Sequence, residues 1–190
     1  MADTIRAFIA VPLPGKAKEA VCAMADRFLE SGLPVRCVKP EALHLTLRFL
    51  GDVERGRVGE ISAAMDNAAA GVAPFTLCAT GMGVFPGFSR PRVVWVGLDG
   101  DVSPLRGLFS RLEDELFEIG FEREPRRFHP HLTLGRARGR MDPNRTVAAV
   151  DSCTGLGSEP FTVDRFVLYQ SDLLPEGARH TPLYTARLSG

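Results

Sequence analysis

The tetrapeptide His-Leu-Thr-Leu occurs twice in this chain, as HLTL at residues 44–47 and again as HLTL at residues 131–134. The chain has only four histidines in 190 residues, so two identical copies of a motif that begins with histidine indicate an internal repeat. Polar and apolar residues alternate in both copies, which predicts β-strands with one buried face. The histidine and threonine of each copy should share one face, and the two leucines the other.

If the two halves are pseudo-symmetric, the two motif strands can lie side by side about a common axis. Their polar faces would then form one cleft that contains His44, Thr46, His131 and Thr133. Imidazoles titrate near neutral pH, so the pair can supply an acid and a base, and the hydroxyls can hold an anionic group between them. The alternative is two amphipathic strands whose exposed faces happen to begin with histidine, and the duplication argues against it.

Strand-like and helix-like segments alternate around the motifs in two similar halves, which predicts an α+β fold. The expected strands are 6–11, 43–50, 75–80, 92–98, 128–136, 161–171 and 181–188. The expected helices are 16–31, 53–70, 102–120 and 143–150, and the expected loops are 81–91 and 172–182. The length fits a single domain, residues 1–190, made of two lobes that each contribute one motif.

Composition excludes several functional classes. The 23 basic and 23 acidic side chains balance, and 45% of residues are hydrophobic, so the chain should be globular, without a polybasic arm or acidic tail. No apolar run is long enough to span a membrane. The phosphate-binding loop, the dinucleotide fingerprint and the Gly-x-Ser-x-Gly elbow are all missing from the sequence, so ATP, NAD and acyl-serine chemistry have no support.

The cysteines favour a reducing compartment. They stand at positions 22, 37, 78 and 153, with no Cys-x-x-Cys pair, so zinc-ribbon and redox motifs are not predicted. Free thiols are then the expectation. We expect a cytoplasmic monomer that needs neither a cofactor nor a metal.

The chain resembles the RNA 2′,3′-cyclic phosphodiesterases, also called 2′-5′ RNA ligases, of the two-histidine phosphoesterase superfamily. The similarity covers nearly the whole chain and rests on RAFIAVPLP from Arg6, KPEALHLTLRFLGDV from Lys39, GVFPGFSRPRVVWVGL from Gly83, FHPHLTLGR from Phe128 and LYQSDLLPEGARHTPL from Leu168. The resemblance implies a bilobal α+β fold in which two antiparallel sheets flank a central cleft, with the helices outside and the two motifs facing each other.

Roles for the motif residues follow from the resemblance. His44 matches the family's proton donor and His131 its proton acceptor, while Thr46 and Thr133 match the hydroxyls that bond the phosphate's non-bridging oxygens. The implied reaction converts RNA 2′,3′-cyclic ends to 2′-phosphomonoesters, and it can also join RNA ends through a 2′-5′ linkage without ATP. Fragments of tRNA, other RNA ends and small cyclic nucleotides all fit such a site.

Two arginines are candidate phosphate contacts. Arg136 matches a family arginine two residues past the second motif. Strict alternation would turn Arg136 away from His131, but Gly135 could allow a β-bulge that turns it back. Arg48 lies on the catalytic face by parity, and it could equally lie at the solvated end of its strand.

Two other functions remain open. A metalloenzyme could use His129, His131 and His180, but no carboxylate stands at a persuasive spacing, and the paired threonines would be unexplained. A non-catalytic module that binds RNA ends could use the basic stretch 121–140, through Arg123, Arg126, Arg127, Arg138 and Arg140. Phe85, Phe88 and Trp95 could stack a base there, although a strand residue such as Trp95 is expected in the core.

Overall fold

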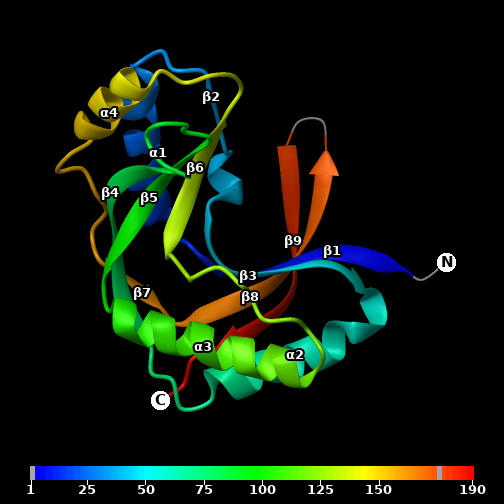
Figure 1. Ribbon diagram of the computed structural model, residues 1–190. Helices are drawn as coiled ribbons and strands as arrows, with labels where there is room; N and C mark the ends of the chain where they lie inside the picture. Colours follow the sequence, from blue (N-terminus) through cyan, green and yellow to red (C-terminus); the bar gives the residue numbers. More distant parts are fainter. Residues whose placement is uncertain (1–2, 175–176) are drawn as a thin grey trace.

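The computed structural model describes residues 3–174 and 177–190, and these form a mixed α+β fold (Figure 1), which confirms the predicted fold class. The strands are β1 (Thr4–Pro12), β2 (Val35–Cys37), β3 (His44–Glu54), β4 (Phe75–Phe85), β5 (Val93–Gly100), β6 (His131–Ala137), β7 (Phe161–Val163), β8 (Arg165–Leu174) and β9 (Gly177–Arg187). The helices are α1 (Gly15–Leu29), α2 (Val58–Ala69), α3 (Val102–Glu118) and α4 (Pro143–Asp151), with short 3₁₀ turns at Pro40–Ala42 and Arg55–Arg57.

All strands belong to one curled antiparallel sheet in the order β7-β4-β5-β6-β3-β1-β8-β9, and β2 adds to β6. The two expected sheets are therefore continuous. Their junction is narrow, because β3 and β6 pair at a single position, Leu45 with Leu132. These leucines are equivalent residues of the two motifs, so the pairing relates the motif strands by a local twofold axis.

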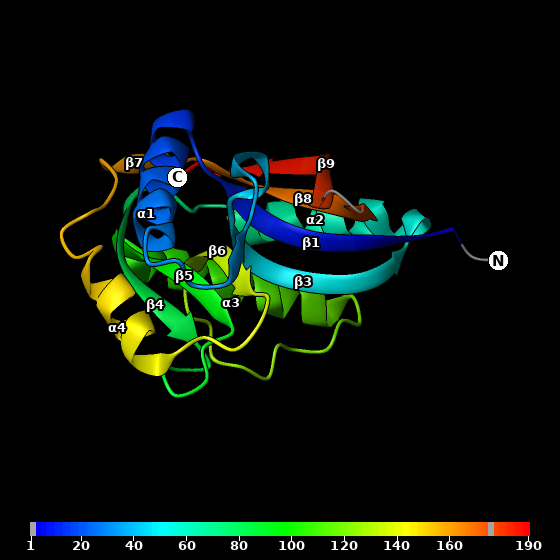
Figure 2. The same cartoon turned by 90° about the horizontal axis from the view of Figure 1, so that it is seen from above.

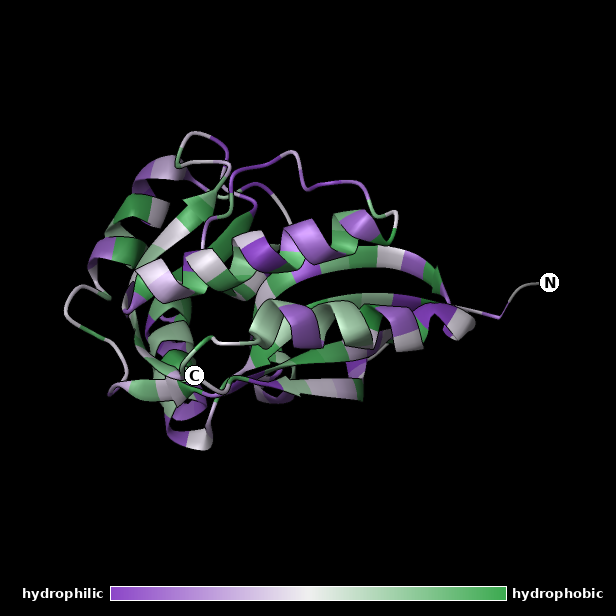
Figure 3. Ribbon diagram, turned by 90° about the horizontal axis from the view of Figure 1, so that it is seen from below, coloured by the Kyte–Doolittle hydropathy of each residue, from purple (hydrophilic) through white to green (hydrophobic). Residues whose placement is uncertain are grey.

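The helices cover the outside of each half. Helices α2 and α3 lie together under β1, β3 and β8, and α1 and α4 lie beside β4 (Figures 1 and 2). Hydrophilic and hydrophobic bands alternate along α2 and α3, as expected for amphipathic helices (Figure 3). The motif leucines are buried and belong to the same core as the apolar stripe of α3: Leu45, Leu47, Leu132, Leu134, Leu105, Leu108, Leu112 and Leu116. No helix among the described residues is long and apolar enough to cross a membrane.

Pairing across the sheet overrides local pattern at three places. Strand β3 continues to Glu54 because it stays paired with β1, so the helix expected from residue 53 begins at Val58. Strand β4 runs on to Phe85 opposite β5, through half of the expected loop 81–91. The segment 172–182, also expected as a loop, is mostly the β8–β9 hairpin. The prediction for α4 holds: the Asp142 side chain accepts a hydrogen bond from the Arg145 backbone N–H, as an N-cap does.

Candidate active site

The structure holds the two motif histidines in the same way. Nδ1 of His44 lies 2.8 Å from the carbonyl oxygen of Ala42, and Nδ1 of His131 lies 2.6 Å from that of His129. A carbonyl oxygen only accepts, so each Nδ1 must carry the hydrogen. Nε2 of each ring is then the nitrogen left for a substrate. Ala42 and His129 occupy equivalent positions of the repeat, so the backbone orients both imidazoles identically.

The pairing between β3 and β6 brings the two motifs together in antiparallel register. Leu45 lies opposite Leu132 in an antiparallel pair, so the register directs His44 toward the side of Thr133, and Thr46 toward the side of His131. The junction brings His44, Thr46 and Thr133 into the lining of one cleft, and His131 directly precedes Leu132 of the same junction.

A cleft of about 440 Å³ lies over this junction. It is lined by His44 and Thr46 from β3, by Thr133 and Arg136 from β6, and by side chains of the β8–β9 hairpin. His131 is not part of this lining; its ring stands half-buried beside it, 5.0 Å from the Phe85 ring and 6.4 Å from the Trp95 ring, measured between centroids.

A β-bulge follows the motif in each strand. The extra residue is Leu47 in β3 and Leu134 in β6, at equivalent positions of the repeat. A bulge shifts the alternation of faces by one residue. As a result Phe49 and Arg136, which are also equivalent positions, both line the cleft.

Glycine at position 135 is required by this geometry. A Cβ there would come within 2.7 Å of the Val35 side chain and 2.8 Å of the Arg36 carbonyl oxygen. The bulge lies one residue before Gly135 and brings the exposed Arg136 into the lining of the cleft, which is where a phosphate contact would have to stand.

The same shift takes Arg48 away from the cleft, so its placement by parity is wrong. Arg48 is 9% exposed, and its Nε lies 3.2 Å from Oε1 of Glu113. Its Nη1 lies 3.3 Å from Oε2 of Glu124, and its Nη2 donates to the Glu122 carbonyl oxygen. Arg48 therefore ties β3 to α3 and to the segment after α3, and is not a candidate for phosphate contact.

Phe49 and His180 are cleft residues that the sequence did not assign to the two-histidine site, although His180 was considered as a metal ligand. Phe49 is 59% exposed inside the cleft, and its equivalence to Arg136 in the repeat was the available signal. His180 reaches the cleft from β9 and packs edge-on against His44, with 5.3 Å between ring centroids. His180 comes from a hairpin distant in sequence, and no motif marks it.

The structure also bears on the two alternative functions, the metalloenzyme and the non-catalytic RNA-binding module. Within the described residues no group of three His, Cys, Asp or Glu side chains is arranged to hold a metal ion. His180 packs against His44 and not against the pair formed by His129 and His131. Trp95, expected in the core, is half-buried beside His131, and Gly83 gives its indole room.

Burial lowers the pKa values of three imidazoles in or beside the cleft. Burial lowers the pKa of His44 to about 4, with further lowering by the charges of His180 and His131, and the Ala42 carbonyl opposes the shift. Burial also lowers the pKa of His131 and of His180. An anion bound in the cleft would raise the pKa values of these imidazoles.

This burial predicts a pH-dependent stability. His44 has a folded pKa of about 4 and an ordinary unfolded pKa of about 6.5, so the unfolded chain binds more protons between these values. The free energy of unfolding should therefore fall as the pH drops through that window. Urea unfolding at pH 7 and pH 4.5 should show a smaller fall for His44→Gln than for the wild type. Parallel falls would contradict the depressed pKa.

The chain matches the family model described as LigT like Phosphoesterase twice, over residues 11–95 and 96–180. It is 32% identical over 184 residues to an RNA 2′,3′-cyclic phosphodiesterase of Methanothermobacter thermautotrophicus, covering 97% of this chain and 99% of that protein. A crystal structure from Thermus thermophilus superposes with a TM-score of 0.79 at 26% identity, over 97% of this chain and 98% of that one.

Escherichia coli LigT complexed with 3′-AMP superposes with a TM-score of 0.77 at 27% identity, over 98% of this chain and 99% of that one. These matches confirm the resemblance inferred from the two motifs. The two family matches also divide the chain so that each half contains one motif.

Proposed function

The chain belongs to the LigT-like phosphoesterase family, and from this premise we propose that it hydrolyses RNA 2′,3′-cyclic phosphodiester ends to 2′-phosphomonoesters by histidine acid–base catalysis. The observation that carries the proposal is the pair of identically held His-x-Thr units, joined through Leu45 and Leu132. The names of the curated relatives and the 3′-AMP bound to the E. coli protein support the substrate class.

In the proposed reaction Nε2 of neutral His131 takes a proton from a water molecule as the water oxygen attacks phosphorus. The bond between phosphorus and the ribose O3′ breaks, and Nε2 of protonated His44 gives its proton to O3′. The phosphate remains on O2′. One proton enters His131 and one leaves His44, so proton exchange with solvent restores the starting state.

The surroundings of the two rings suit these roles. A protonated imidazole with a low pKa is a strong acid, and the negative phosphate supplies the charge that keeps His44 protonated once substrate is bound. The hydroxyls of Thr46 and Thr133 would donate to the non-bridging oxygens as negative charge develops on them. Arg136, at the edge of the same cleft, adds a cation for the same oxygens.

The same steps account for a ligase activity. If the 5′-hydroxyl of a second RNA replaces water, His131 takes the hydroxyl proton and the attack forms a 2′-5′ phosphodiester while O3′ leaves. No ATP is needed, because the bond between phosphorus and O3′ supplies the energy. Hydrolysis should dominate in dilute solution, where water is far more concentrated than RNA ends.

The deciding experiment offers the protein an RNA that ends in a 2′,3′-cyclic phosphate, with a chelator present. We expect a 2′-phosphate product, separated from the 3′-phosphate by chromatography against standards, and one ¹⁸O atom in the phosphate when the water is labelled. Activity that disappears with chelator and returns with a metal would favour a metalloenzyme. RNA binding without turnover would favour the non-catalytic module.

A further inference from the structure

The arginines of this protein fall into two groups. In the described part of the chain most form ion pairs or side-chain hydrogen bonds, such as Arg123 with Asp114 at 2.7 Å and Arg126 with Glu124 at 2.9 Å. The structure gives no such partner within the described residues to Arg6, Arg36, Arg90, Arg92, Arg127, Arg136, Arg138, Arg140 and Arg187. The basic stretch 121–140 therefore divides: its first part is largely neutralised and its last part is not.

Six of the unpartnered arginines stand on adjoining backbone. Arg36 pairs with Arg136 between β2 and β6. The Ala137 N–H donates to the Arg92 carbonyl oxygen at 2.8 Å, and the Arg138 N–H donates to the Pro34 carbonyl oxygen at 2.8 Å. We call the set the arginine track, and its members are Arg36, Arg90, Arg92, Arg136, Arg138 and Arg140.

No acidic residue interrupts the segments that carry the track. Residues 31–40, 81–98 and 128–141 contain neither aspartate nor glutamate. Neither ion pairs among the described residues nor acidic neighbours in sequence therefore compensate this positive charge. Charge that the protein does not neutralise is available to an anionic ligand.

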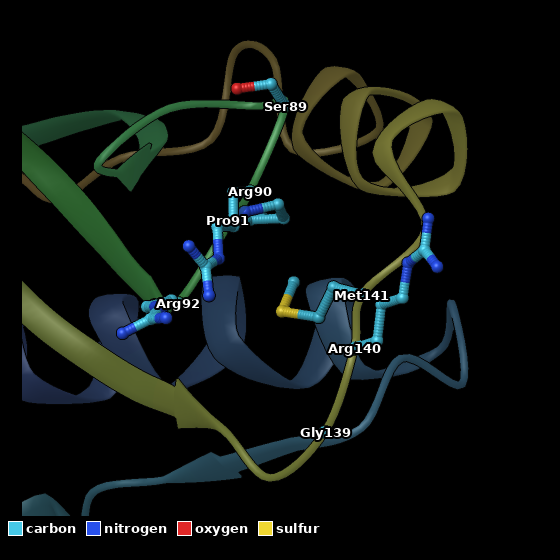
Figure 4. Close-up of a pocket in the computed structure, with 7 residues that line it drawn as sticks. All are labelled: Ser89, Arg90, Pro91, Arg92, Gly139, Arg140 and Met141. Atoms are coloured by element: carbon cyan, nitrogen blue, oxygen red, sulfur yellow. The ribbon is translucent and has the colours of Figure 1, made fainter.

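The track joins two hollows. Its first end, Arg36 and Arg136, lines the catalytic cleft. Its other end lines a hollow of about 530 Å³ between the segment before β5 and the segment after β6, formed by Ser89, Arg90, Pro91, Arg92, Gly139, Arg140 and Met141. In Figure 4, Arg90 and Arg92 stand on one side of this hollow and Arg140 on the other, with Met141 between them. Cations spread in this way suit several phosphates along a chain better than one phosphate ion.

We propose that the arginine track and the hollow at its far end bind backbone phosphates of a single-stranded RNA whose 2′,3′-cyclic end occupies the cleft. The inference rests on the proposed function and extends it: the preferred substrate is an oligoribonucleotide, and nucleotides upstream of the reacting end contribute to binding. Phosphate contacts of this kind add affinity without reading sequence, and they weaken as salt rises.

The test uses the triple variant Arg90→Ala, Arg92→Ala and Arg140→Ala, which leaves the cleft intact. We expect its KM for an eight-nucleotide RNA with a cyclic end to rise on the order of tenfold at low salt, with a shallower dependence on salt, because phosphate contacts are lost. Its kcat/KM for cytidine 2′,3′-cyclic monophosphate should be unchanged. The matched control is Arg127→Ala with Arg187→Ala, two unpartnered arginines outside the track, and it should behave as the wild type.

Three results would overturn the proposal: an unchanged KM of the triple variant for the RNA, an equal loss of kcat/KM with the mononucleotide, or an equal rise in KM in the control variant. Inhibition by inorganic phosphate tests whether the hollow binds free phosphate and not the phosphates of RNA. If the hollow served free phosphate, the triple variant would lose that inhibition while its KM for RNA stayed the same. If the wild type hydrolyses neither substrate, the proposed function fails. RNA binding by the arginine track can still be tested then, by fluorescence anisotropy with the same RNA ending in a 3′-hydroxyl. A loss of affinity in the triple variant, but not in the control, would support the track.

Discussion

Replacing His44 or His131 by alanine should lower turnover of an RNA 2′,3′-cyclic phosphate by about 10²–10⁴-fold, the usual contribution of one positioned acid or base. The double variant should lose much less than the product of the two single losses, because residues that act as a unit are not additive. Single-turnover rates measure the chemical step directly. Circular dichroism and thermal unfolding check that each variant remains folded. Full activity in both single variants would remove the two-histidine mechanism.

A substrate with a better leaving group separates the two roles. If a p-nitrophenolate leaves, its oxygen needs no proton, so His44→Ala should regain most of its rate and His131→Ala should not. In the wild type, the rate against pH should be bell-shaped, because one imidazole must be neutral while the other is charged. Recovery of His131→Ala in place of His44→Ala would exchange the donor and the acceptor.

Replacing Arg48 by alanine should destabilise the protein by about 3–5 kcal/mol, the cost of leaving a buried partner charge uncompensated. The partner is Glu113, which is 7% exposed and also accepts a hydrogen bond from the Glu124 backbone N–H at 2.8 Å. Urea unfolding at pH 7 gives this loss as a lower midpoint. Substrate affinity of the folded fraction should be nearly unchanged, because Arg48 lies outside the cleft.

Arg136→Ala is the matched control for Arg48→Ala. Arg136 is exposed and has no ion pair within the described residues, so its loss should leave the unfolding midpoint within about 0.5 kcal/mol of the wild type and raise KM for the phosphorylated end. A lower unfolding midpoint for Arg48→Ala and a higher KM for Arg136→Ala would separate the structural arginine from the binding one. An Arg48→Ala variant of normal stability and poor substrate binding would return Arg48 to the site.

Strong local patterns carried most of the prediction. The long apolar stripes placed the helices that became α1 and α3 within a few residues. The duplicated motif predicted that the two motif strands would meet, and Leu45 of one motif does pair with Leu132 of the other. His44, Thr46 and Thr133 line the cleft at this junction, and His131 lies outside its lining. These inferences needed only periodicity and repetition.

Features that depend on partners distant in sequence were not predictable. The bulges at Leu47 and Leu134 arise from register with β1 and β5, and they decide that Arg136 enters the cleft while Arg48 leaves it. His180 reaches His44 from β9, which joins the sheet through its pairing with β8. The division of the arginines into paired and unpaired groups depends on acidic residues of other elements, such as Asp114 of α3.

The local twofold relation between the motif strands has a consequence for substrate polarity. Two equivalent histidines and two equivalent threonines could receive a phosphodiester in either of two opposite orientations. In the proposed reaction, only one of these orientations would bring water to His131 and O3′ to His44. The degeneracy is broken at the equivalent positions 49 and 136, where one half offers an exposed phenylalanine and the other an arginine. A nucleobase can stack on the Phe49 ring, and a phosphate can form an ion pair with Arg136. In the proposed reaction, the difference between Phe49 and Arg136 would therefore favour one orientation of the bound phosphodiester over the other.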